Sequence, residues 1–162
     1  MKLKEVRLMK KLNKQHFKNY FRGFKNDWRD KIYEYEGKYY FTNKISLVRL
    51  NSNYGLEVEN DKERGKILHD MIDGFEYFYE FGYTDEITGN TDYRCIKDMI
   101  CNVIIPEYQV NALQLEKIST LLKSKEHKRV LKNANSTSAM KYIVKIENTD
   151  DEVGYLLPIK IY

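Results

Sequence analysis

Residues 31–50 read KIYEYEGKYYFTNKISLVRL, a run of β-branched and aromatic residues that turn-forming residues interrupt at Gly37 and again at Asn43-Lys44. The segments between these interruptions have the length and composition of strands. The stretch therefore predicts a hairpin of Lys31–Glu36 and Lys38–Thr42, followed by a strand over Ile45–Leu50.

Helical spacing of apolar residues flanks this run of strands on both sides. Apolar residues recur every three or four positions from Leu3 to Lys25 and again from Asn60 to Phe81, which predicts two amphipathic helices. A third helix is predicted over Leu113–Leu122, with Asn111 as a candidate N-cap. Residues 84–92 are predicted to form a loop. Further strands are predicted over 55–58, 96–106, 127–132, 139–147 and 153–161.

The charges are unevenly distributed along the chain. The 162 residues carry 28 Lys+Arg and 24 Asp+Glu, a formal net charge of +4. Residues 1–31 alone sum to +8, residues 57–98 to −7, and residues 107–145 to +5. Alternating blocks of this kind indicate surfaces that meet different partners.

The first predicted helix carries a basic stripe. At 100° per residue its Lys and Arg side chains fall in one sector of roughly 80°, which contains no acid and spans roughly 32 Å along an unbroken helix. Such a stripe is typical of contact with a polyanion, although a solvated helix face gives the same pattern. The stripe consists of Lys4, Arg7, Lys11, Lys14, Lys18, Arg22 and Lys25.

The acidic block falls mainly on the second predicted helix and its flanks. Closely spaced carboxylates on a helix can occupy a basic channel built for phosphates. This makes the helix a candidate surface for a protein partner. The candidate partner-binding residues are Asp70, Asp73, Glu76 and Glu80.

Three stretches and the order of elements resemble one domain of the bacterial DNA polymerase sliding clamp. Residues 39–49 are similar to its strand–turn–strand pattern, residues 103–123 to its passage through a proline into an amphipathic helix, and residues 155–161 to its closing strand. The resemblance implies an α+β fold in one clamp-like domain over 1–162. That domain has two helix-then-strands units, antiparallel sheets backed by two basic helices, and an inserted acidic helix at about 60–92.

The same resemblance implies a function. A clamp-like protein is not an enzyme, acts in phage or bacterial DNA replication, and meets the phosphates of double-stranded DNA without reading sequence. Because one domain cannot encircle DNA, it also implies a homo-oligomer. The second basic helix and the segment after it supply further candidate DNA contacts at Lys117, Lys123, Lys128 and Arg129.

An alternative function stays open at this point. A phage or mobile-element inhibitor would use the acidic helix to bind a host replication or defence protein or nucleoprotein, as a clamp decoy or as an inhibitor of a nucleic-acid-guided nuclease. Reversing lysines of the basic stripe separates this hypothesis from DNA binding, because a decoy would retain its activity.

The sequence offers little support for catalysis or cofactors. It contains no phosphate-binding glycine loop, zincin motif or serine elbow. His69 and Asp73 have the spacing of a metal-binding pair, but two ligands are too few and an ordinary surface pair is the simpler reading. Cys95 and Cys101 form no CxxC pair, so reduced structural thiols are expected. No apolar run is long enough to span a membrane, and we expect a cytoplasmic protein without cofactors, metals or a membrane partner.

Overall fold

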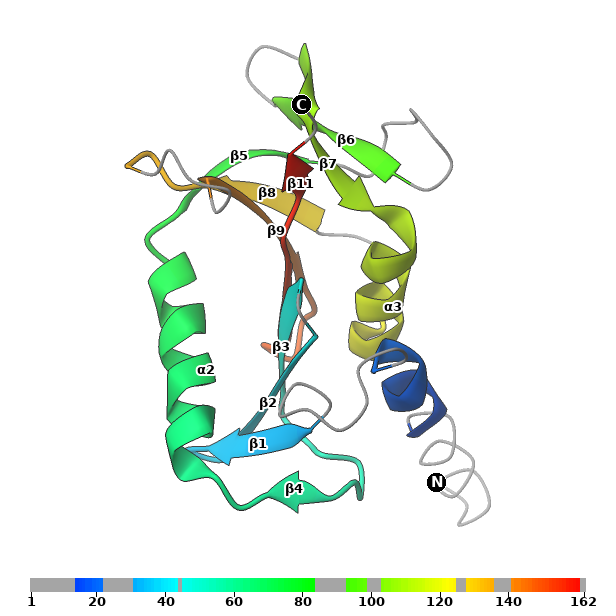
Figure 1. The fold of residues 1–162 in the computed structure, drawn as a ribbon, viewed down its shortest axis with the longest axis vertical. Coiled ribbons are helices and arrows are strands. Elements are labelled where there is room, and N and C mark those ends of the chain that lie inside the picture. The colour runs from blue at the N-terminus through cyan, green and yellow to red at the C-terminus, as the bar shows by residue number, and fades with distance from the viewer. Residues whose placement is uncertain are drawn as a thin grey trace.

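The chain folds as one continuous, mainly antiparallel sheet with helices on both faces (Figure 1). The computed structural model describes residues 14–21, 31–43, 45–83, 93–98, 103–124, 128–135 and 141–160. Within these residues it contains helices and strands together, which confirms a mixed fold at the level of class. The strand order is β11-β7-β6-β5-β8-β9-β10-β3-β2-β1-β4.

The predicted hairpin forms as the sequence indicates. β1 (Ile32–Tyr35) and β2 (Lys38–Asn43) pair antiparallel, and β3 (Ser46–Leu50) pairs with β2. At the turn, Glu36 and Gly37 have φ values of 50° and 80°. Positive φ at both central residues matches the right-handed twist of the two strands, so the turn sets their register. β4 (Val58–Glu59) adds a short parallel pairing to β1.

The second predicted helix is shorter than its apolar spacing indicates. α2 covers Lys62–Phe75, and Asp61 caps it by accepting a hydrogen bond from the backbone N–H of Arg64 at 3.0 Å. Residues 79–81, which we predicted to be helical, belong to β5 (Tyr79–Tyr83). Glu80 therefore lies on a strand. The helix docks on the sheet through Leu68, Ile72 and Phe75, all of which are buried.

The single strand predicted over 96–106 is wrong, because the structure divides this range between two paired strands. β6 (Tyr93–Asp98) pairs with β7, which runs over Val103–Asn111 and passes through Pro106 without ending there. The register of this pair shifts between Cys95, opposite Gln109, and Ile96, opposite Ile105. Pro106 lies between Ile105 and Gln109, in the part of β7 that has no partner residue on β6. A proline is tolerated there because it lacks a backbone N–H to donate.

The third helix confirms its predicted cap. α3 covers Ala112–Leu122, and the Asn111 side chain accepts a hydrogen bond from the backbone N–H of Gln114 at 3.0 Å. The helix ends where Lys123 adopts a left-handed conformation with φ 51° and ψ 37°. Three strands follow, β8 (Lys128–Lys132), β9 (Tyr142–Glu147) and β10 (Val153–Leu156), and the short β11 (Ile159–Lys160) pairs with β7. The predicted strand over 153–161 is thus two strands with different partners.

The central pairing joins distant parts of the chain. β10 lies between β9 and β3, so the first hairpin and the last strands share one sheet. Glu152 is buried beside this junction and accepts hydrogen bonds from the backbone N–H of Asn51 at 2.9 Å and from Asn148 Nδ2 at 3.0 Å. Asn148 Nδ2 also donates to the carbonyl of Leu122 at 2.9 Å. The β9–β10 turn thereby fastens the end of α3 to the sheet.

The two faces of the sheet bury separate cores. On one face, Phe17, Tyr20 and the α3 residues Leu115, Ile118 and Leu122 pack on the strands. On the other face, α2 packs on a second apolar cluster through Leu68, Ile72 and Phe75. Residues 14–20 and α3 therefore cover one face, which we call the helix-pair face, and α2 covers the opposite one (Figure 1).

Candidate nucleic-acid interface

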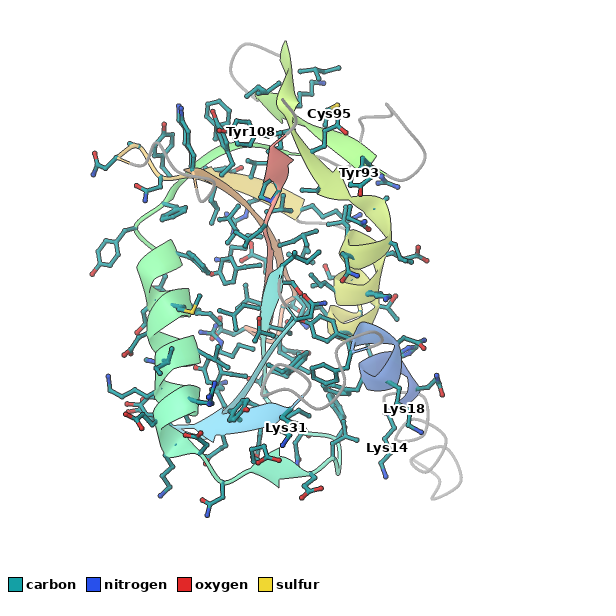
Figure 2. The ribbon with its side chains drawn as sticks, in the orientation of Figure 1. Lys14, Lys18, Lys31, Tyr93, Cys95 and Tyr108 are labelled. Atoms are coloured by element: carbon teal, nitrogen blue, oxygen red, sulfur yellow. The ribbon has the colours of Figure 1, made fainter. Side chains whose placement is uncertain are left out.

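The helical residues 14–20 include two solvent-exposed lysines, Lys14 and Lys18. Phe17 and Tyr20 are buried, and the Phe17 ring lies 5.0 Å from Phe41 of the sheet, measured between ring centroids. Lys14 and Lys18 are exposed, and Figure 2 shows both projecting from the helix. Because the apolar side is fixed on the sheet, the two charges have a fixed position.

A buried polar chain fixes the same segment. The Tyr20 hydroxyl lies 2.6 Å from Ser46 Oγ, which donates to Asn43 Oδ1 at 2.6 Å. Asn43 Nδ2 donates to Gln114 Oε1 of α3 at 3.0 Å. Burial raises the pKa of Tyr20 well above its usual value, so the phenol stays protonated. The chain of contacts ties residues 14–20, the β2–β3 turn and the start of α3 into one unit.

Removing one hydroxyl tests this unit. Replacing Tyr20 with Phe is expected to lower the free energy of unfolding by about 1 kcal/mol, because Ser46 loses a buried partner while the ring packing stays. Urea denaturation measures the change. The control is Tyr77→Phe, at a side chain that is 91% exposed, and we expect no change there. Equal stability of the two variants would contradict a structural role for the network.

The second helix is not basic, contrary to the prediction. α3 carries one base, Lys117, and one acid, Glu116, and their formal charges cancel. The expected charge came from the segment after the helix, but α3 ends at Leu122 and Lys123 is its C-cap residue. Lys123 is exposed and Lys117 is half-buried. The structure thus places a smaller charge on this helix than a clamp-like channel would carry.

The predicted basic residues of β8 divide between the two faces of the sheet. Side chains alternate along a strand, and Val130 packs in the core under α3 whereas Leu131 packs in the core under α2. Lys128 therefore shares the helix-pair face with Lys14 and Lys18. Arg129 lies on the opposite face, so the structure does not bring it together with them.

Arg129 is also already paired. Its guanidinium contacts Glu147 and, at 3.4 Å, Glu80 of β5. Tyr155 lies on the same face of the neighbouring strands, and burial raises the pKa of its hydroxyl to about 12. A guanidinium held by two carboxylates contributes little attraction for a phosphate. The sequence alone does not indicate the contact between Arg129 and Glu80, because the two residues are 49 positions apart.

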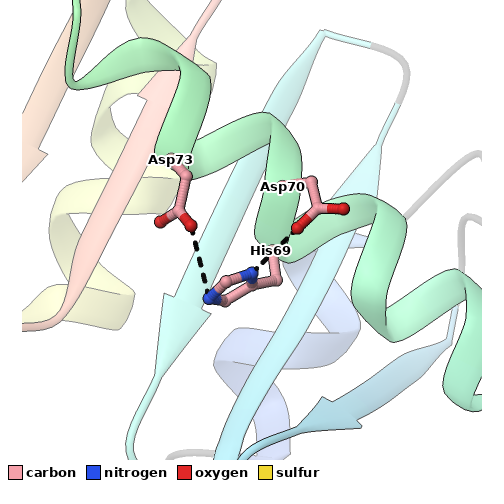
Figure 3. A group of neighbouring side chains, drawn as sticks. All are labelled: His69, Asp70 and Asp73. Atoms are coloured by element: carbon pink, nitrogen blue, oxygen red, sulfur yellow. Dashed lines mark hydrogen bonds and ion pairs between the residues drawn. The ribbon is translucent and has the colours of Figure 1, made fainter.

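The acids predicted to bind a partner are mostly paired within the protein (Figure 3). Asp70 pairs with Lys66 at 2.7 Å and lies 3.2 Å from His69 Nδ1, and Asp73 lies 3.6 Å from His69 Nε2. The hydrogen bond from Lys66 lowers the pKa of Asp70, and the same bond raises the pKa of Lys66. Glu76 is exposed at the end of α2.

His69, Asp70 and Asp73 are close enough together to be tested as a metal site. His69, Asp70 and Asp73 bring ligand atoms within 4.8 Å of one another. However, each imidazole nitrogen faces a different carboxylate (Figure 3), and one metal ion binds only one nitrogen of a histidine. The geometry therefore fits one imidazole lying between two carboxylates within the helix.

The helix is also less acidic than predicted. Over Lys62–Phe75, three bases match three acids, because the flanking carboxylates of the acidic block lie outside the helix. The block's net charge comes from residues before and after α2, so the helix does not present a uniform acidic face.

The remaining predicted contacts lie outside the described residues. These are five members of the basic stripe, Lys4, Arg7, Lys11, Arg22 and Lys25. The predicted helix over Leu3–Lys25 is accordingly described only at residues 14–20, where it is helical. Cys101 is likewise outside, and Cys95 is a buried free thiol on β6.

Comparison of the chain with known protein families, curated proteins and solved structures finds no match. Among the residues that the structure describes, no helix has the length and apolar character to cross a membrane.

Proposed function

We propose that this protein is a non-enzymatic DNA-associated protein that contacts duplex phosphates through the helix-pair face. The observation that carries the proposal is the pair Lys14 and Lys18, exposed and held in place by the buried Phe17 and Tyr20. No carboxylate pairs with either lysine in the described part of the chain, and residues 1–31 sum to +8. Lysines that project from an anchored helix attract phosphates, because binding releases counterions from the duplex.

The arrangement of helices supports a clamp-like version of this function. Residues 14–20 and α3 pack on the same face of an antiparallel sheet, and only Glu116 among their residues is acidic. In a clamp-like protein acting in DNA replication, this face would meet the duplex. The near neutrality of α3 implies that the N-terminal segment supplies most of the attraction.

The charge pattern favours this function over the inhibitor hypothesis. A phosphate mimic needs carboxylates that are free to meet a basic partner, whereas Asp70, Asp73 and Glu80 each contact a base within the chain. We therefore favour DNA association over the inhibitor hypothesis. If the protein does not bind DNA, the inhibitor hypothesis takes its place.

Salt dependence tests the proposal. Affinity for unrelated duplexes of equal length, followed by fluorescence anisotropy, is expected to be the same for each sequence and to fall steeply with salt. Four to six phosphate contacts predict a slope of log K against log salt of roughly −4 to −5. Affinity that depends on sequence, does not change with salt, or is undetectable at about 50 mM salt would contradict the proposal.

A further inference from the structure

The outer surface of α2 carries apolar side chains that the sheet does not cover. Ile67 is 54% exposed and Met71 is 44% exposed, one helical turn apart, whereas the helix docks on the sheet through Leu68, Ile72 and Phe75. Tyr77, just beyond the helix, is 91% exposed. Gly74 leaves the surface open near the helix end, since an added Cβ would meet nothing within 4 Å. Adjacent exposed apolar side chains rimmed by charges are typical of a protein–protein contact.

The two halves of α2 differ in net charge, and its C-terminal half carries acids where the helix dipole favours bases. The bases Lys62, Arg64 and Lys66 occupy its first half together with one acid, Glu63, whereas the second half carries only the acids Asp70 and Asp73, followed by the C-cap residue Glu76. A helix dipole favours acids at the N-terminus and bases at the C-terminus, but the last turn of α2 contains no base. The pairs Lys66–Asp70 and His69–Asp73 relieve this only in part.

An antiparallel copy of the same helix complements both features. It would set the basic first half of one α2 against the acidic second half of the other, oppose the two helix dipoles, and bring the Ile67 and Met71 side chains together. A two-fold interface uses the same patch on both copies, so a patch with opposite charges at its two ends is its own complement.

We propose that two copies of this chain associate through the outer surfaces of their α2 helices, packed antiparallel. The charge order selects a second copy as the occupant, because an unrelated partner would need the reverse order by coincidence. α2 lies on the face opposite residues 14–20 and α3, so the dimer leaves both helix-pair faces free. The proposal does not depend on DNA binding.

Two charge-reversed variants test the antiparallel pairing. One is Lys62→Glu with Lys66→Glu, and the other is Asp73→Lys with Glu76→Lys. Sedimentation velocity from about 1 to 200 µM is expected to show a concentration-dependent dimer for the wild type. Each variant alone is expected to be monomeric because like charges then meet across the two-fold axis. An equimolar mixture of the two is expected to restore a one-to-one dimer.

Controls separate this contact from misfolding and from other surfaces. Lys14→Glu with Lys18→Glu changes the net charge equally on the opposite face and is expected to dimerise like the wild type. Met71→Ser, at an exposed position, is expected to raise the dimer dissociation constant about tenfold or more. Circular dichroism checks that each variant is folded. A wild type that stays monomeric, or a Met71→Ser chain that dimerises like the wild type, would overturn the proposal, as would folded variants that do not associate on mixing.

Discussion

Reversing Lys14 and Lys18 to Glu is expected to weaken binding to a short DNA duplex by roughly 50- to 100-fold near 0.1 M salt. Each phosphate contact contributes about 0.9 to the slope of log K against log salt, so the loss of two contacts accounts for this factor and lowers the slope by about 2. Fluorescence anisotropy over a salt series gives both quantities from one set of titrations. The two lysines are exposed, so the fold is expected to persist.

The matched control carries the same change of charge on the other face of the sheet. Lys62→Glu with Lys66→Glu alters α2, which is separated from residues 14–20 by the sheet. A duplex of about 12 base pairs, little more than one helical turn, accommodates one copy and removes any contribution from a dimer. The control is expected to bind within about threefold of the wild type. A salt slope that is unchanged in the Lys14 and Lys18 variant would show that phosphates bind elsewhere.

Local signals in the sequence predicted the elements whose ends are set by local chemistry. The β1–β2 turn forms at Glu36-Gly37 because both residues adopt positive φ, and α3 begins at Asn111 because that side chain caps it. Lys14 and Lys18 are also exposed and Phe17 is buried, as an amphipathic helix requires. In each case the decisive interaction lies within a few positions along the chain.

The spacing of apolar residues led to a wrong prediction for the end of α2, because apolar residues continue to pack on the core after the helix ends. Phe75 is the last residue of α2, yet Phe78, three positions later, packs on the same core, with the two ring centroids 5.6 Å apart. The helical period therefore persists through the turn at residues 76–78 that leads into β5. Pro106 likewise signalled an end to its strand, but the irregular pairing of β6 and β7 absorbs it.

Distant pairings determine the rest of the candidate site. The pairing of β10 with β3 places the first hairpin and the last strands in one sheet, and these strands are about 100 positions apart in the chain, as in the pairing of Val153 with Arg49. The sequence analysis grouped Lys128 and Arg129 by charge alone, whereas alternation along β8 places them on opposite faces of the sheet. Charge blocks counted along the chain therefore overstated the charge of both α2 and α3.

Replacing Gly154 with Ala is expected to lower the free energy of unfolding by about 1–3 kcal/mol, the range for overpacking a buried site. Gly154 lies on the central strand β10 beneath α3, where an added Cβ would lie 2.4 Å from Ile118 Cγ2. Neither side can move freely, because Asn148 fastens the end of α3 and β10 is paired on both edges. Urea denaturation monitored by circular dichroism measures the loss.

A control and a double variant locate the cost at this contact. Gly74→Ala, in exposed helix where a Cβ meets nothing, is expected to stabilise the protein by about 0.5–1 kcal/mol. Ile118→Ala alone is expected to cost about 2–5 kcal/mol through the cavity it leaves. Combined with Gly154→Ala, the total loss is expected to fall short of the sum by about 1–2 kcal/mol, because the new Cβ occupies space that Ile118 vacates. If the losses in the free energy of unfolding were strictly additive, Ile118 of α3 would not contact Gly154. The close packing of α3 on the sheet would then be wrong.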